Sequence, residues 1–117
     1  IYHEARGEAL SGQAAVAHVT LIRAEDPKYP GTVCEVVAQR NEKACQFTWF
    51  CQKATVAAAD RESFRRALRV ALEVLQGQRA DPTRGATHFI TTSMRMPGWA
   101  RRLTHTATIG GHRFFRY

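Results

Sequence analysis

The chain has 117 residues, of which 44% are hydrophobic and 23% charged, so residues 1–117 are expected to form one ordinary globular domain. No apolar run approaches the length of a membrane span, so no membrane partner is expected. The formal net charge of +7 suits a polyanionic partner, either nucleic acid or a bacterial cell wall, or serves solubility alone, and charge does not separate these. Lysine and arginine never form a run of five or more, which weakens the case for nucleic acid.

The first half of the chain is expected to be helical. Residues 1–8 indicate a short helix, and a longer helix opens at Ser11-Gly12-Gln13. This second helix is apolar almost all round, which predicts a central, buried element. It is expected to end before Asp26-Pro27, because a residue that precedes proline disfavours helix. Thr32 is then expected to cap a short helix that runs to Gln39.

Residues 41–51 are interpreted as a loop with aromatic content, and an amphipathic helix follows at residues 61–76. Asp60 is expected to cap this helix and Gly77 to end it. The apolar residues at helical spacing predict an inner face made of Phe64, Leu68, Ala71, Val74 and Leu75.

Strands are expected only near the end of the chain. Turn-forming residues at 81–85 precede β-branched and aromatic residues at 87–92, which predict a strand. Two further β-prone runs flank Gly110-Gly111, a favoured two-residue hairpin turn. Helices first and a small antiparallel sheet last define an α+β domain.

The stretch YHEARGE at residues 2–8 carries candidate catalytic groups. A zinc-protease helix would need a second histidine four residues after His3, and Gly7 stands there, so no metal site is expected. A helix would place Glu4 and Glu8 on one face about 6 Å apart, near the spacing of a retaining glycosidase pair. Gly7 disfavours a continuing helix, so Glu8 is interpreted as a solvated residue. Glu4 lies in a weakly charged stretch, where burial would favour a carboxyl that keeps its proton.

Three cysteines, Cys34, Cys45 and Cys51, leave two arrangements open, one disulfide with a free thiol or no disulfide. No CxxC motif occurs, which disfavours a zinc ribbon or a redox pair. Buried, inert thiols are a more common arrangement than a cysteine nucleophile.

Six blocks of the sequence together resemble the cell-wall hydrolase family that includes the spore-cortex-lytic enzymes, whose domain also occurs in phage endolysins. The blocks are YHEARGE with GQAAVAHV, YPGTVCEVVAQ, CQFTW, DPTRGATHF, PGW and IGGHRFFR. One block alone would be weak, but six in the family's order along essentially the whole chain are specific. Two positions differ from the family: Ile22 stands where members usually carry Asn before the arginine, and Ile90 where members often carry Tyr.

The resemblance implies a lysozyme-like fold and cleavage of the β-1,4 bond between N-acetylmuramic acid and N-acetylglucosamine, commonly as a lytic transglycosylase. It assigns the role of catalytic acid to Glu4. A protonated Glu4 would donate to the glycosidic oxygen and then accept the proton of the sugar's own C6 hydroxyl, which closes a 1,6-anhydro ring. A hydrolytic muramidase is the alternative. It would usually need a second carboxylate, and the few candidates are Glu8, Glu35, Glu42 and Asp81.

Polar and aromatic residues of the CQFTW block are candidates for binding the glycan, because sugars stack on aromatic rings and hydrogen-bond to amides and hydroxyls. Gln46, Thr48 and Trp49 are expected to line the groove, whereas Phe47 is expected to lie in the core.

Three further candidates for binding substrate are His88, Trp99 and His112. His88 and Phe89 point to opposite faces of their strand, so one of the two faces the cleft. Trp99 is either a stacking residue at the lip of the groove or a cap on the core. His112 follows the hairpin turn and either binds substrate or braces the turn.

The expected partner is therefore the glycan strand of peptidoglycan, reached in the cell wall, in the periplasm or by phage delivery to the host wall. The chain is expected to act as a monomer without metal or cofactor. Two other hypotheses stay open. A catalytically silent wall-binding module would use the same cleft but would not need Glu4, and a nucleic-acid-binding domain rests on charge alone.

Overall fold

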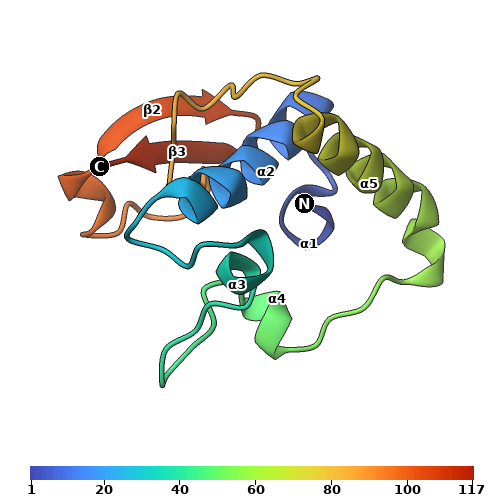
Figure 1. The fold of residues 1–117 in the computed structure, drawn as a ribbon, viewed down its shortest axis with the longest axis horizontal. Coiled ribbons are helices and arrows are strands. Elements are labelled where there is room, and N and C mark those ends of the chain that lie inside the picture. The colour runs from blue at the N-terminus through green and yellow to red at the C-terminus, as the bar shows by residue number, and fades with distance from the viewer.

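The computed structural model describes residues 1–117 as short and long helices around one three-stranded sheet (Figure 1). The helices are α1 (Tyr2–Ala5), α2 (Leu10–Glu25), α3 (Val33–Val37), α4 (Thr48–Cys51) and α5 (Arg61–Leu75), with the 3-10 turns η1 (Ala58–Asp60) and η2 (Ala100–Arg102). The strands are β1 (His88–Thr91), β2 (Thr104–Ile109) and β3 (His112–Arg116). No helix has both the length and the apolar character that crossing a bilayer requires. The expected α+β class is confirmed.

Helix α2 forms the centre of the molecule, with the sheet on one side and α5 on the other (Figure 1). Its small apolar residues allow contact on both sides. Ala15 and Val19 pack with Phe114 of β3, whereas Ala14 packs with Val70 of α5. Removing this apolar surface from water contributes roughly 25 cal/mol per Å² buried. The predicted buried helix is therefore confirmed, and so is its end before the Asp-Pro pair.

The three strands form an antiparallel sheet in the order β1-β3-β2. Gly110-Gly111 joins β2 to β3, and Gly110 has a φ of +54°, a left-handed conformation that glycine adopts without strain. Phe114 and Phe115 of β3 point to opposite faces of the sheet. Phe114 enters the core against α2, and Phe115 packs with Ile90 beneath η2. The predicted hairpin is confirmed, and both faces of the sheet are covered.

The predicted inner face of α5 is wrong in part. Val74 is buried, but Phe64, Leu68 and Leu75 are 41%, 50% and 64% exposed. The buried face is formed by smaller residues, namely Ala67, Val70 and Val74. Small residues let α5 approach α2 closely. The apolar face of α5 extends further around the helix than the part that contacts α2. Its larger apolar side chains therefore remain at the surface.

The end of α1 and the cap of α5 also differ from the predictions. Helix α1 stops at Ala5 because the chain turns there, with the amide of Glu8 donating to the Ala5 carbonyl at 2.9 Å. Asp60 precedes α5, but its side chain does not cap the helix. Its carboxylate instead accepts a hydrogen bond from the hydroxyl of Tyr2 at 2.7 Å, which ties η1 to α1.

The short helix α3 begins as predicted and ends early. Thr32 Oγ1 accepts a hydrogen bond from the amide of Glu35 at 3.2 Å, the contact of an N-terminal cap. The helix ends at Val37, two residues before the predicted end at Gln39.

The turn at residues 81–85 is organised by the carboxylate of Asp81. Oδ1 accepts hydrogen bonds from the amide and hydroxyl of Thr83 at 2.8 and 2.6 Å, and Oδ2 accepts one from the amide of Gly85 at 2.8 Å. Burial raises the pKa of Asp81, but the three hydrogen bonds outweigh burial and hold the pKa below its usual value. The ionised group therefore stabilises the fold above about pH 4, and this contribution is lost as the pH falls through the lowered pKa.

Replacing Asp81 by Asn is expected to lower the free energy of unfolding by about 1–3 kcal/mol at neutral pH, because the amide nitrogen cannot accept a hydrogen bond. Urea denaturation from pH 7 down to about pH 2 should show the difference from the wild type shrinking in acid. Asp26→Asn is the matched control, because the Asp26 carboxylate accepts only one exposed backbone hydrogen bond, from Lys28. A difference that stays the same at every pH would contradict the role given to the ionised carboxylate.

Candidate active site

The carboxyl of Glu4 is held by an indole. Trp49 Nε1 donates a hydrogen bond to Glu4 Oε1 at 3.1 Å. The Trp49 ring also stacks on His3, with 4.8 Å between the ring centroids and 26° between the planes. Burial lowers the pKa of His3, so its ring is uncharged at neutral pH. Both Glu4 and Trp49 are half-buried, which leaves the carboxyl oriented and still reachable from solvent.

The segment that carries Trp49 is fastened to the rest of the fold. A disulfide joins Cys45 to Cys51 around it, and residues 48–51, expected as loop, form the helix α4. Phe47 is 5% exposed, as expected for a core residue, and its ring lies 5.8 Å from that of Trp49. The cysteine pairing left open by the sequence is thus resolved. Cys34 is a free thiol and is exposed, unlike the buried thiols that are more common.

Glu8 does not share a helix face with Glu4, because α1 ends between them. Glu8 Oε1 accepts a hydrogen bond from the amide of Gly111 at 2.7 Å and lies 3.0 Å from Nδ1 of His112. Glu8 is therefore a residue of the hairpin contact, and its interpretation as a solvated helix residue is wrong. His112 is 5% exposed and sits beside this carboxylate. Of its two open roles, this position supports bracing the turn and does not support binding substrate.

A buried arginine, not selected from the sequence as a functional residue, lies behind the Trp49 segment. Arg23 is 3% exposed, and its Nε donates to the carbonyl of Thr87 at 2.7 Å. Its guanidinium lies over the rings of Tyr29 and Phe47, at 5.4 and 5.6 Å from their centroids. It forms no ion pair, and burial lowers the pKa of Arg23. The available signal was a basic residue in the last turn of a largely apolar helix.

Replacing Arg23 by Lys is expected to lower the free energy of unfolding by about 1–3 kcal/mol. Lysine keeps the charge but loses the Nε–H bond to Thr87 and the flat guanidinium that lies over the rings of Tyr29 and Phe47. Urea denaturation at neutral pH measures the change. The exposed Arg101, replaced by Lys in the same way, should change stability by less than about 0.5 kcal/mol. Equal effects of the two substitutions would contradict the stacked geometry.

His88 belongs to an aromatic cluster at the other end of this region. Its ring centroid lies 5.3 Å from those of Trp99 and Tyr117 and 6.5 Å from that of Tyr29. Trp99 is 38% exposed, so it is available for stacking although its edge meets the core. The strand alternation is also resolved, because Phe89 packs on the core against α2 and His88 therefore faces the cluster.

Burial lowers the pKa of His88, and the nearby charges of Arg23 and Lys28 lower it further. The ring is therefore neutral at neutral pH. Nδ1 lies 2.8 Å from the hydroxyl of Thr87, and Nε2 lies 3.5 Å from that of Tyr29. A neutral imidazole with these partners can offer one donor or one acceptor to a ligand.

Arg23 connects the two clusters. Its guanidinium lies over the ring of Phe47, which neighbours Trp49, and over the ring of Tyr29, which neighbours His88. The structure therefore brings the groups selected from the CQFTW block and from β1 into one continuous region.

Gln46 and Thr48 are both exposed, on either side of the buried Phe47. Neither side chain has a hydrogen-bond partner within the chain, and only Trp49 of this block bonds to Glu4. The structure thus places these two residues beside Trp49 and leaves them free to contact a ligand.

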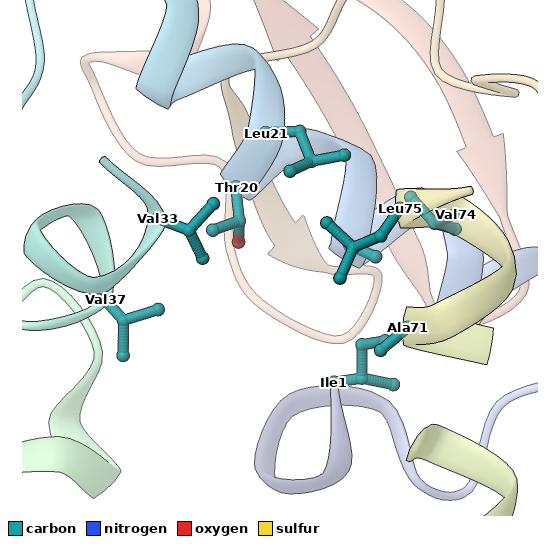
Figure 2. Close-up of a pocket in the computed structure, with 9 residues that line it drawn as sticks. Ile1, Thr20, Leu21, Val33, Val37, Ala71, Val74 and Leu75 are labelled. Carbon is teal, nitrogen blue, oxygen red and sulfur yellow. The ribbon is translucent and has the colours of Figure 1, made fainter. Parts of the chain in front are cut away.

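A largely apolar hollow of about 170 Å³ lies apart from Glu4, between α2, α3 and α5 (Figure 2). In Figure 2, Val33 and Val37 of α3 face Leu21 of α2 and Leu75 of α5 across it. Eight of its nine lining residues are hydrophobic, and none has an acidic or basic side chain. It therefore lacks a group for acid–base chemistry. No three side chains of His, Cys, Asp or Glu gather that could hold a metal ion.

A half-buried carboxyl that is oriented by an indole and lies beside aromatic rings suits acid–base cleavage of a glycosidic bond. Comparison with known proteins agrees. Residues 7–115 match the family described as Cell Wall Hydrolase. The spore cortex-lytic enzyme of Halalkalibacterium halodurans is 35% identical over 114 residues, which are 97% of this chain but only 32% of that protein. The chain belongs to the cell wall hydrolase family, as its motifs indicated.

Two solved structures share the fold. The catalytic domain of the germination-specific lytic transglycosylase SleB from Bacillus anthracis superposes with a TM-score of 0.78 at 28% identity, covering 98% of this chain and 86% of that one. The catalytic domain of SleB from Bacillus cereus gives 0.77 at 27% identity, covering 98% and 82%. The expected lysozyme-like fold and the class of cell-wall enzyme are confirmed. Glu4 precedes the family-matched residues, so its assignment depends on the geometry above.

Proposed function

We propose that the chain cleaves the β-1,4 bond between N-acetylmuramic acid and N-acetylglucosamine of peptidoglycan, as a lytic transglycosylase with Glu4 as its acid and base. The observation that carries this proposal is the hydrogen bond from Trp49 to Glu4, which orients a half-buried carboxyl. Membership of the cell wall hydrolase family and the lytic transglycosylase among the solved relatives support the same reaction.

The Trp49 contact assigns separate tasks to the two carboxyl oxygens. An indole N–H can only donate, so Glu4 Oε1 is an acceptor in both protonation states. The catalytic proton is therefore carried on Oε2. It passes to the glycosidic oxygen as the C1–O bond breaks and leaves Glu4 as a carboxylate. The C6 hydroxyl then bonds to C1 and returns its proton to Glu4, so a 1,6-anhydro ring forms without water.

The positions of other carboxylates support a transglycosylase over a hydrolytic muramidase. A hydrolase usually needs a second carboxylate as nucleophile or as a base for water. Glu8 is engaged by the hairpin, Asp81 by its own turn, and Glu35 by Thr32. None of these three contacts Glu4.

We also propose that the glycan lies across the region between Trp49 and Trp99. The half-buried Trp49 at one end and the exposed Trp99 at the other offer aromatic rings on which sugars stack. Gln46 and Thr48 would hydrogen-bond to the sugar beside Trp49, and His88 to the sugar beside Trp99.

We propose that this domain acts outside the cytoplasm, where peptidoglycan lies, and that it acts as a monomer. The Cys45–Cys51 disulfide supports this location, because disulfides persist in oxidising compartments. The net charge of +7 suits an anionic wall. Binding to purified walls should therefore weaken as salt is added.

Mass spectrometry of peptidoglycan digested by the domain tests the proposal. Muropeptides with 1,6-anhydro ends are the expected product. Reducing muramic acid ends would instead indicate a hydrolytic muramidase. Wall binding without any cleavage would indicate a binding module and overturn the proposed activity.

A further inference from the structure

Glu8 makes a contact between distant parts of the chain that the proposed reaction does not use. It is four residues after Glu4, yet its carboxylate bonds to the amide of Gly111, 103 positions along the chain. His112 Nδ1 lies 3.0 Å from the same oxygen, Oε1. The Glu8 side chain is only 20% exposed, so this contact is shielded from competing water.

The hairpin turn is shaped to receive this carboxylate. A Cβ on Gly110 would lie 2.9 Å from Glu8 Oε2, and a Cβ on Gly111 would lie 2.9 Å from Oε1. Gly110 also needs glycine for its φ of +54°, but Gly111 has an ordinary backbone conformation. At Gly111, therefore, an added side chain would meet the Glu8 carboxylate, which would have to move away.

The contact joins the element that carries Glu4 to the strand that carries His88. On one side, the amide of Glu8 bonds to the carbonyl of Ala5 at the end of α1. On the other, the contact lies at the first residues of β3, which pairs in register with β1: Thr91 opposes His112, and His88 opposes Phe115. A shift at the turn would thus move β1 relative to α1.

We infer that Glu8 is a positioning residue that sets the separation between Glu4 and the His88 strand. This inference rests on the proposed function, in which the sugar's C6 hydroxyl must reach C1 before water does. A fixed separation favours that internal attack, because the reacting groups are already oriented. A looser separation admits water, whose oxygen bonds to C1 and whose proton goes to Glu4, leaving a reducing end in place of an anhydro ring.

The test compares Glu8→Ala, Glu8→Gln, Gly111→Ala and the double variant Glu8→Ala/Gly111→Ala, with Glu62→Ala as the control. Glu62 is an exposed residue of α5, paired only with Arg65. For each variant, kcat, KM, the thermal midpoint and the ratio of reducing to anhydro ends are measured on the same peptidoglycan. Glu8→Ala is expected to lower kcat by about tenfold to a hundredfold and to raise the share of reducing ends. Glu8→Gln keeps an oxygen acceptor and should retain most of the wild-type ratio.

Gly111→Ala should reproduce the Glu8→Ala result, because the new methyl group displaces the carboxylate. In the Glu8→Ala background the same change should add almost nothing, since the clash is gone. Where Glu8→Ala gives no folded protein, Glu8→Asp replaces it as the single variant and in the double variant. The side chain of aspartate is one methylene shorter, so its carboxylate does not reach Gly111.

A merely stabilising contact would lower the amount of active enzyme without changing the ratio of the two products. An unchanged ratio in Glu8→Ala, or additive effects of the two substitutions, would therefore overturn the inference. If the wild type itself forms only reducing ends, the transglycosylase proposal fails. Non-additive losses of kcat in the double-variant cycle would then still support Glu8 as a positioning residue.

Discussion

Glu4→Gln is expected to lower the rate of peptidoglycan cleavage by about a thousandfold or more, in line with the loss of general acid–base catalysis. The amide has nearly the same shape as the carboxyl and can still accept a hydrogen bond from Trp49. It can neither donate the catalytic proton to a leaving oxygen nor take one back. Wall binding should therefore remain while cleavage disappears. The decrease in turbidity of purified walls, with mass spectrometry of the soluble products, measures the change.

Two comparisons make the Glu4 result specific. Glu62→Gln, on the exposed surface of α5, should cleave at the wild-type rate. The thermal midpoint of Glu4→Gln should lie close to that of the wild type, because the half-buried side chain keeps its volume. A Glu4→Gln variant that keeps more than about a tenth of the wild-type rate would show that another group supplies the proton.

Trp49→Phe is expected to lower kcat by about tenfold, the effect of losing one hydrogen bond worth about 1.4 kcal/mol in the transition state. Phenylalanine keeps an aromatic face for stacking on His3 but has no N–H for Glu4. Without that bond the carboxyl can turn, and its proton-bearing oxygen is no longer fixed. Because the stacking face is retained, KM should change much less than kcat. Steady-state kinetics on solubilised glycan strands separates the two parameters.

The second tryptophan provides the contrasting variant. Trp99 has no contact with Glu4 and is proposed to stack on a sugar, so Trp99→Ala should raise KM more than it lowers kcat. Trp49→Phe with a wild-type kcat would contradict the orienting role of the indole. If Trp49→Phe and Trp99→Ala changed kcat and KM in the same way, the two tryptophans could not be assigned different roles, one in orienting the acid and one in binding sugar.

Elements whose signals are local were predictable from the sequence. The apolar run that forms α2 ends at an Asp-Pro pair, and Thr32 caps α3 through a hydrogen bond three residues away. The hairpin follows from Gly110-Gly111 between two β-prone runs. Each of these helix ends, caps and turns depends on residues that are close together in the sequence. The residue types alone are therefore enough to predict them. Glu4 was also selected, mildly by its weakly charged surroundings and mainly by its motif and family resemblance.

Features that depend on contacts between distant residues appeared only in the tertiary structure. The face of α5 that meets α2 is chosen by how closely two helices can approach, so Ala67 is buried and the larger Leu68 is exposed. Trp49 reaches Glu4 across 45 positions, and Glu8 reaches Gly111 across 103. The sequence favours Glu4 over Glu8 but does not show where either carboxyl points. Their contacts differ because α1 ends between them, which sends the Glu4 carboxyl to the indole of Trp49 and the Glu8 carboxyl to the hairpin turn.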